Sequence, residues 1–432
     1  MMKKRFLSIF FMCLAVYTST SLLTAQNVEL DLGFCGTNEL SPDMRTWLGN
    51  HQQNPDKPNY RNYKNGNYEY LPVQFHVVGD SQGEGYFPRT SMYRLLCEVN
   101  DQFSESDLQF FMYDDFNYLN NDDWYEHNFG QGYEMMDANN VDDVINIYMV
   151  DDPAGNCGYF SPSVDGIAVA KMCADAGSGT TAHEIGHYLS MPHTFSGWEG
   201  HDYFTDPINE NQWEKVDGSN CLFRGDGFCD TPPDYVSDRW NCPYTLDLFD
   251  TNGEPVNPDG TLYMSYSNDG CSARFSEEQK DAMLAYVYEV RSYLLNADVP
   301  EIESVQNTYA HFPASGTQEV PYENVLLTWK AAEGASEYYL NLKQFAEEEG
   351  ISVQTTVTDT FYVVTLTPDV QYYYWVKPLN AGNTCGEQGE GNFTTSSTSV
   401  LYASNVEVSM VGCHEGNDGF VLVEMEGGTP PY

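Results

Sequence analysis

The sequence predicts a mixed α/β domain of the α+β type, followed by all-β sandwich modules. Between residues 69 and 189, strand-like alternation takes turns with helical spacing of apolar residues. Between residues 300 and 396, strand-like runs recur without helical patterns between them. Residues 195–262 are rich in Gly, Pro, Asp, Asn and Cys, which predicts a long functional loop region in the first domain. A chain of 432 residues has room for two or three domains.

The N-terminus has the pattern of an export signal. Residues 1–25 join a positively charged start, a short apolar run and small residues before a cut ahead of Gln26. The run is too short to anchor the chain and no second stretch of about 18 apolar residues follows, so we expect a secreted protein without a membrane span. Residues 26–65 are rich in Asn, Pro, Tyr and Gly, which predicts a pro-segment or an irregular extension. Arg45 and Arg61 are the candidate processing points.

The first domain is predicted to occupy residues 66–298. Alternating Leu71, Val73, Phe75 and Val77 predict its first strand, and helical spacing predicts a helix over residues 92–103. Three more strands and a short helix are expected at residues 108–113, 144–150, 166–171 and 180–189. A capping box at residues 276–279 opens the closing helix. Its apolar stripe is expected at Met283, Val287, Val290 and Leu294.

The C-terminal third is predicted to be all-β. In residues 299–397, strand-like runs lie at 325–329, 338–342, 361–366 and 372–376, which is typical of a small β-sandwich. This segment resembles a fibronectin type III module. Residues 398–432 begin a further β module, and their GGTPPY ending resembles the repeats of SprB-type bacterial surface adhesins. The resemblance implies contact of these modules with a cell surface or matrix.

The charge balance narrows the classes of partner. The chain has 64 acidic and 19 basic residues, a formal net charge of −45. Such a chain lacks the basic surface that binding to nucleic acid or anionic membranes requires. The excess of carboxylates favours cationic substrates and bound calcium.

The cysteines predict disulfides, because an exported chain folds in an oxidising compartment. Ten of the eleven cysteines follow the signal segment. Short separations favour the pairs Cys157–Cys173, Cys221–Cys229 and Cys242–Cys271. Cys385 and Cys413 either pair with each other or belong to separate domains.

The segment from His183 to His193 carries the expected chemistry. His183 and His187 are four residues apart, so on a helix they lie on one face and can bind one Zn²⁺. His193 can return as the third ligand after the helix ends, which leaves a position open for water. Glu184 can accept a proton from that water. HExxH also occurs by chance, but the third histidine and the export signal favour a catalytic zinc site. A gluzincin, whose third ligand is a later Glu, is disfavoured because Glu199 lies too close in sequence.

Several motifs together resemble the pappalysin (ulilysin-like) group of metzincin peptidases. They are VNDQF (99–103), INIY (145–148), HEIGH with its third histidine, GDGFCDTP (225–232), YMSY (263–266) and RFSEEQ (274–279). The resemblance covers residues 35–296. It implies a metzincin catalytic domain with a mixed twisted sheet, an active-site helix and a loop-rich lower subdomain.

The resemblance also implies roles for residues around the zinc. Met264 is the hydrophobic floor beneath the histidines, and Tyr266 hydrogen-bonds the oxyanion. The substrate pairs with the strand at 166–171 by β-augmentation. Similar enzymes cut before Arg or Lys, and Asp269 is the acidic candidate for that P1′ preference. The family usually has Gly where this chain has Ser190, so Ser190 is either strained, at about 1 kcal/mol, or in a different turn.

Calcium is the second implied cofactor, with one or two structural ions. Carried over from the family's GDGFCDTP motif, Asp226 and Thr231 offer side-chain oxygens, and Gly225 and Cys229 offer carbonyls. The alternative is a turn with Asx hydrogen bonds and no ion.

Cys35 is followed by Gly36 and Thr37, the CGT motif of similar zymogens. There the cysteine sulfur occupies the open zinc position, so Cys35 is a candidate latency residue. The alternative is a disulfide, for which Cys97 is a candidate partner; if Cys35 is the switch, Cys97 is expected to stay free.

The sequence therefore predicts a secreted zinc endopeptidase made as a latent zymogen, acting on protein or peptide substrates. The alternative from another class is a catalytically inert secreted adhesin, which keeps the scaffold and binds matrix or glycans. The presence of Glu184 favours the enzyme.

Overall fold

The computed structural model describes residues 33–37, 40–64, 66, 68–268, 270–345, 351–397, 402–409 and 420–426. The predicted signal segment, Asp269 and Cys413 lie outside the described residues. Within the described part of the chain, no helix is long and apolar enough to cross a membrane.

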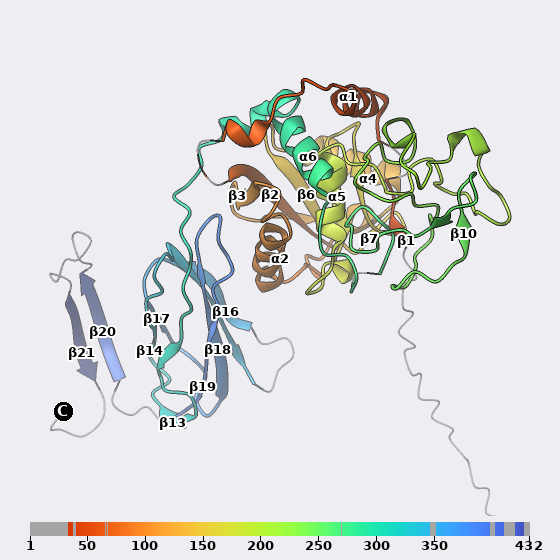
Figure 1. The fold of residues 1–432 in the computed structure, drawn as a ribbon. Helices are drawn as coiled ribbons and strands as arrows, with labels where there is room; N and C mark the ends of the chain where they lie inside the picture. The colour runs from red at the N-terminus through yellow and green to blue at the C-terminus, as the bar shows by residue number, and fades with distance from the viewer. Residues whose placement is uncertain are drawn as a thin grey trace, which may run out of the picture. The chain divides into compact units, whose positions relative to one another are not determined.

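A mixed seven-stranded sheet forms the frame of the first domain (Figure 1). Its order is β1-β8-β9-β6-β2-β3, with β4 also paired to β2. β8 and β9 are antiparallel, and the other pairs are parallel. The strands are β1 (Gly33–Cys35), β2 (Glu69–Gly79), β3 (Leu108–Met112), β4 (Asn117–Asn120), β6 (Ile145–Val150), β8 (Asn156–Ser161) and β9 (Gly166–Ala170).

Both faces of the sheet are covered, which explains why its central strands are apolar on successive residues. Ile147 and Met149 of β6 face the larger core, whereas Tyr148 and Val150 face a second core. The larger core contains residues of α2 (Arg89–Gln102), α5 (Thr180–Tyr188) and α6 (Glu277–Glu289). The second contains Met135 and Met136 of α4 (Phe129–Asn139). The α+β class predicted from the sequence is confirmed.

The closing helix begins as predicted and ends earlier. Ser276 Oγ accepts the Gln279 backbone N–H at 3.1 Å, and Gln279 Oε1 accepts that of Ser276 at 2.9 Å. The helix ends at Glu289, so Val290 is 43% exposed and the prediction that it belongs to the apolar stripe is wrong. Leu294 is buried from the following 3₁₀ turn η5 (Ser292–Asn296).

The N-terminal segment is more regular than predicted, because it contains α1 (Pro42–Gln52). Ser41 caps this helix and Pro42 occupies its first turn, a common helix start. Met44 and Leu48, four residues apart, are buried in the larger core. The helix packs on α6, where the Trp47 and Tyr286 rings lie 4.7 Å apart (Figure 1). The sequence contained these signals, and the prediction of an irregular segment is wrong here.

A β-sandwich follows the first domain, as the strand-like runs predicted. Its two sheets have the orders β12-β14-β17 and β13-β19-β18-β15-β16 and share one core. The strands are β12 (Ala310–Phe312), β13 (Thr317–Val320), β14 (Val325–Trp329), β15 (Glu337–Gln344), β16 (Ile351–Val357), β17 (Phe361–Val364), β18 (Gln371–Leu379) and β19 (Gly389–Thr395). Its membership of the fibronectin type III group stays a prediction. A separate hairpin pairs β20 (Tyr402–Ser409) with β21 (Phe420–Glu426).

The three short-range disulfides predicted from the sequence are present: Cys157–Cys173, Cys221–Cys229 and Cys242–Cys271. A fourth joins Cys97 of α2 to Cys385, across 288 residues of sequence. The expectation that Cys97 stays free is therefore wrong, as are its pairing with Cys35 and a Cys385–Cys413 bond. Cys35 is a free thiol.

Candidate metal centre and substrate cleft

Helix α5 presents His183 and His187 to one point, as their spacing predicted. All nine of its residues are buried. The His183 Nδ1 lies 2.6 Å from the Tyr263 carbonyl oxygen, and the His187 Nδ1 lies 2.8 Å from that of Met191. Each carbonyl fixes the proton on Nδ1, so the Nε2 lone pair is left to face the site.

The turn after α5 brings His193 back to the same point. Met191 N–H donates to the Gly186 carbonyl and Ser190 N–H donates to that of His187, the two bonds of a Schellman turn. Ser190 has φ +71°, so it adopts the left-handed conformation that the family fills with Gly. The turn is therefore the expected one with a strained serine. The Ser190 hydroxyl donates to the Met44 carbonyl of α1 at 3.3 Å.

Three imidazole nitrogens converge at the end of this turn. The Nε2 of His187 lies 3.0 Å from that of His183 and 3.1 Å from that of His193. Burial lowers the pKa of His183 to about 3 and lowers those of the other two, so the rings are neutral. Neutral lone pairs this close repel unless a cation lies among them. The donor set therefore fits a metal ion, and three histidines are the set that catalytic zinc uses.

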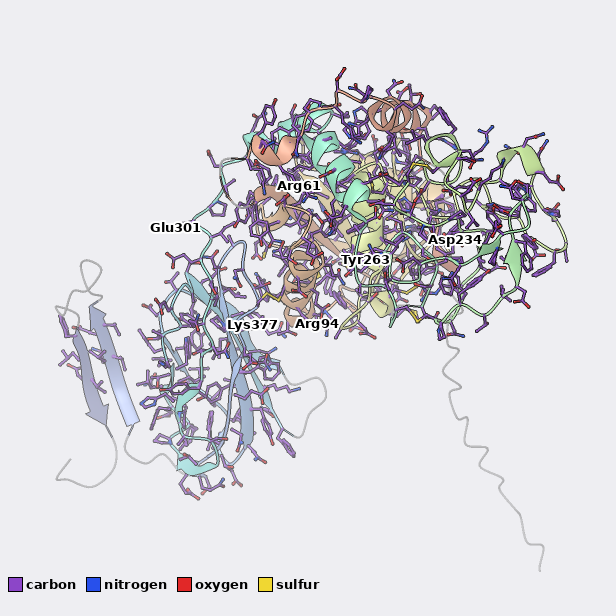
Figure 2. The ribbon with its side chains drawn as sticks, in the orientation of Figure 1. Arg61, Arg94, Asp234, Tyr263, Glu301 and Lys377 are labelled. Carbon is purple, nitrogen blue, oxygen red and sulfur yellow. A yellow bond between two sulfur atoms is a disulfide. The ribbon has the colours of Figure 1, made fainter. Side chains whose placement is uncertain are left out.

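Met264 packs against the helix that carries His183 and His187. It is fully buried, and a Cβ atom added to Gly186 of α5 would lie 2.5 Å from its sulfur. Its carbonyl accepts the Thr194 N–H at 3.1 Å, just after His193. The Met264 turn therefore supports the site from below, and Tyr263 beside it holds His183. Tyr263 is labelled in Figure 2.

Glu184 is fully buried beside the histidines. Burial raises the pKa of its carboxyl to about 8. Its Oε2 accepts the Thr37 hydroxyl at 3.4 Å, whereas its Oε1 has no protein partner among the described residues. β8 approaches closely here: a Cβ at Gly158 would lie 3.0 Å from Oε1. A buried carboxylate oxygen without a partner is costly and is common at functional sites.

The N-terminal strand β1 covers this centre. The Cys35 sulfur lies 3.5 Å from the His187 Nε2, and it forms one group with the three histidine nitrogens, all within 4.8 Å of one another. Gly33 N–H and Gly36 N–H donate to the carbonyls of Gly155 and Gly158, which pairs β1 with β8 in parallel. Cys35 thus lies where the latency prediction placed it.

The predicted substrate-pairing strand is wrong. β9 is paired on both sides, to β6 and β8, so its backbone cannot bind a peptide. The strand at the edge of the cleft is β8, and β1 is paired with its outer edge. The sequence analysis missed β8 because its residues, NCGYFS, include Asn, Gly and Ser and do not form an apolar run.

Tyr266 closes the cleft opposite β8. Its hydroxyl donates to the Cys35 carbonyl at 3.2 Å, and its ring packs edge-on against His193. Tyr266 therefore already donates to a peptide carbonyl next to the histidines. Asp269, predicted to set specificity, lies outside the described residues.

The predicted calcium residues form a tight turn. The Thr231 hydroxyl donates to Asp226 at 2.9 Å, and Phe228 N–H donates to the same oxygen at 3.0 Å. Cys229 N–H donates to Glu278 at 2.7 Å. A turn held by Asx hydrogen bonds without a calcium ion, the alternative given in the sequence analysis, would show the same contacts.

Two further buried carboxylates were missed by the sequence analysis. Glu214 approaches Gly225 so closely that a Cβ there would lie 2.0 Å from its Oε2. Asp234, labelled in Figure 2, accepts the Thr194 hydroxyl at 2.7 Å. Burial, and then the charges of neighbouring acids, raise the pKa values of Glu214 and Asp226. No motif marks Glu214, which lies eleven residues before Gly225 in an irregular segment.

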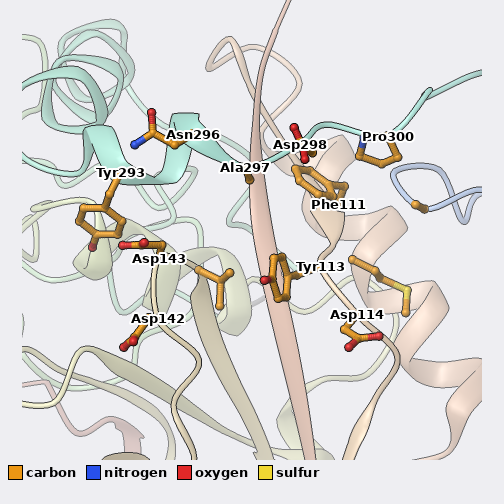
Figure 3. A pocket seen from close by; sticks show the side chains of 13 residues that line it. Phe111, Tyr113, Asp114, Asp142, Asp143, Tyr293, Asn296, Ala297, Asp298 and Pro300 are labelled. Carbon is orange, nitrogen blue, oxygen red and sulfur yellow. The ribbon is translucent and has the colours of Figure 1, made fainter.

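A cavity of about 760 Å³ lies apart from the histidine cluster (Figure 3). Its lining includes Asp114, Asp142, Asp143, Tyr113 and Tyr293. Its lining contains no histidine or cysteine, so it lacks the three-histidine set that catalytic zinc uses. The chemistry therefore belongs to the histidine cluster.

Comparison with known proteins agrees with this geometry. Residues 166–288 match the family model Peptidase_M43, pregnancy-associated plasma protein-A. Residues 166–288 thus match a pappalysin-family metallopeptidase domain. The matched segment of this pappalysin domain includes the three histidines, Glu184 and Met264. The metallopeptidase predicted from the sequence is confirmed, and the family implies zinc.

Curated relatives of the pappalysin domain are fungal. An extracellular metalloprotease of Colletotrichum graminicola is 25% identical over 244 residues, which are 51% of this chain and 77% of that protein. Extracellular metalloprotease 1 of Coccidioides posadasii is 28% identical over 158 residues, 32% of this chain and 48% of that protein. Among solved structures, mirolysin in complex with compound 9 is 18% identical with a TM-score of 0.38, covering 54% of this chain and 97% of its own.

We expect Gly186→Ala to destabilise the pappalysin domain by roughly 1–3 kcal/mol, because its methyl group displaces the buried Met264. Thermal unfolding and zinc content measure the effect. The matched control is Gly49→Ala in α1, where the nearest atom to the added Cβ is 3.9 Å away. There we expect a gain of up to about 1 kcal/mol from helix propensity. Equal stability of Gly186→Ala and wild type would contradict the role given to Met264.

Proposed function

We propose that the protein is a secreted zinc endopeptidase that hydrolyses peptide bonds in extended protein segments. The observation that carries the proposal is the convergence of three neutral histidine nitrogens beside a buried carboxylate with one unpartnered oxygen. The relatives named extracellular metalloproteases support the location. A zinc ion held by His183, His187 and His193 would supply a Lewis acid that polarises water and a peptide carbonyl.

Three parts of this chain would take separate roles in the hydrolysis. Glu184 accepts a proton from the attacking water and donates it to the leaving amine. The Tyr266 hydroxyl, which donates to the Cys35 carbonyl, donates to the oxyanion of a substrate placed there. β8 binds the substrate backbone through the carbonyls that β1 uses.

The proposal includes a preference for Arg or Lys at P1′. The net charge of −45 favours cationic substrates, and Asp269 is the acidic residue assigned to this pocket. Sequencing the new N-termini of cleaved peptides reads this preference directly.

The main test is Glu184→Ala. The variant is expected to keep its zinc, because Glu184 is not a ligand, and to lose activity on a denatured protein by about 10²–10⁴-fold. The matched control is Glu134→Ala, an exposed acid on α4, which is expected to keep wild-type activity. A chelator is expected to inactivate the wild type, and added Zn²⁺ to restore it. Equal inactivity of wild type and Glu184→Ala after removal of residues 33–37 would favour the adhesin alternative.

We propose further that the chain is made latent by Cys35. Its sulfur lies within 3.5 Å of the His187 Nε2, where sulfur would complete the zinc ligands and exclude water. Thr37 adds a second contact by donating to Glu184. The strand would therefore block the open position of a bound zinc and the general base together.

Cys35→Ser is expected to raise the activity of the unprocessed chain severalfold, because a hydroxyl is a poorer zinc ligand than a thiolate. Thr37→Val is expected to give a smaller rise. Thr46→Ser, an exposed change in α1, is the control for the N-terminal segment. The measurement is the rate of peptide hydrolysis before any cleavage of the chain. Unchanged latency in Cys35→Ser would exclude Cys35 as the residue that keeps the chain latent.

We also propose a structural calcium ion at the turn of Gly225–Thr231. The support is that Glu214, Asp226 and Asp234 are all buried, and a cation would offset their mutual repulsion. Glu214 joins the ligands inferred from the family motif because it packs against Gly225.

Calcium at about 100 times its Kd is expected to stabilise the domain by about 2.7 kcal/mol relative to EGTA. Glu214→Gln is expected to reduce this difference, whereas the exposed Glu210→Gln keeps it. Thermal unfolding with and without calcium measures both. Identical melting of the wild type in calcium and in EGTA would rule out the ion.

A further inference from the structure

The side chain next to the Cys35 sulfur fills a pocket of its own. Phe34 precedes Cys35 on β1, and only 9% of its surface is exposed. Its ring meets those of His183 and Tyr266 edge-on, with ring centroids 5.1 and 5.0 Å away. The pocket therefore shares two walls with the metal centre and lies directly beside it.

Arg239 forms the third wall. Its guanidinium carbon lies 4.0 Å from the centre of the Phe34 ring, which is a cation–π contact. Its Nη1 donates to the Ser267 carbonyl at 3.1 Å. The next residue, Trp240, donates its N–H to the Tyr266 carbonyl at 3.2 Å. The backbone that carries Arg239 is thus tied to the segment that carries Tyr266, so the wall is fixed relative to the metal centre.

The pocket is larger than the ring it contains. A space of about 320 Å³ adjoins Phe34, and its lining includes Asn156, Phe195, Glu199, Asp238 and Arg239. It opens beside β8, whose backbone binds β1 at this point. Any extended peptide bound to the edge of β8 in place of β1 would present a side chain to this pocket.

We propose that this pocket is a substrate subsite that selects an aromatic side chain, with Arg239 as its specificity residue and Phe34 as its occupant in the latent chain. This inference rests on the proposed peptidase function. Ring edges from His183 and Tyr266 and a guanidinium over the ring face are the contacts that an aromatic side chain uses best.

The other classes of side chain fit less well. A basic side chain at the position of the Phe34 ring would lie against the like charge of the Arg239 guanidinium, whose carbon is 4.0 Å from that ring, so we assign the Arg or Lys proposed at P1′ to a different pocket. An acidic side chain meets Glu199 and Asp238 in the same lining. A small aliphatic side chain leaves the space unfilled and makes no cation–π contact.

The experiment uses the processed full chain and a peptide library that varies each position around one cleavable bond. The wild type is expected to enrich Phe and Tyr at one position beside the cleaved bond. Arg239→Ala is expected to lower kcat/KM for the aromatic peptide by about two- to fivefold, mainly through KM, and to leave the matching Ala peptide unchanged. Lys330→Ala removes an exposed cation 5.5 Å from the Tyr309 ring in the sandwich, and serves as the matched control.

The outcomes separate the two proposals. Cleavage without aromatic enrichment, or an equal effect of Arg239→Ala on aromatic and Ala peptides, overturns the subsite and leaves the peptidase standing. Absence of any zinc-dependent cleavage by the wild type overturns the peptidase and the subsite together.

A second measurement uses the latent chain, in case Arg239→Ala fails to fold. Phe34→Ala is expected to shorten the lag before activity by about two- to fivefold, and Phe34→Tyr is expected to restore the lag. Equal lags for the wild type, Phe34→Ala and Phe34→Tyr would contradict the proposal that Phe34 occupies the subsite in the latent chain.

Discussion

The site depends on two backbone carbonyls that hold the Nδ1 protons of His183 and His187. They come from Tyr263 and Met191, which lie outside α5, so the metal centre exists only when the turn after the helix and the Met264 turn are both in place. Gly186 permits this arrangement because Met264 packs where its side chain would be. The three nitrogens then face one another without protons between them, and a divalent ion is the natural partner of such a cluster.

The loop-rich segment, residues 195–262, helps to position the residues of the site. Thr194 follows the third histidine, and it is bound from two directions, by the Met264 carbonyl and by Asp234. The backbone of Trp240 continues this connection to Tyr266. The buried carboxylates around Gly225 belong to the same segment. These carboxylates, the position of His193 and the pocket wall at Arg239 are therefore parts of one packed unit.

Local patterns predicted much of this structure. The histidine helix, the capping box at Ser276 and three disulfides follow from spacing over a few residues, and each was confirmed. The predictions that were wrong concern contacts between residues far apart in the sequence. The order of strands decides that β1 pairs with the outer edge of β8 and not with β9, and no local feature of either strand records it. Cys97 meets Cys385 across 288 residues, and Glu214 meets Asp226 through an irregular loop. Helix α1 was the exception, since its cap, its proline and its apolar spacing were all present in the sequence.

Helix α1 bears on the proposed latency, because it ties part of the N-terminal segment to the core. Leu40, Met44 and Leu48 belong to the same core as the histidine helix, and each contributes roughly 1.5–3 kcal/mol by its burial. Arg61 is held by ion pairs to Asp281 and Glu277. A cut at Arg61 would thus separate the active unit from part of its own interior. A cut directly after Thr37 would remove β1 and leave these three core residues in the domain. Under the proposed latency, β1 is thus the part of the N-terminal segment whose removal would expose the histidine cluster, whereas α1 belongs to the core of the domain.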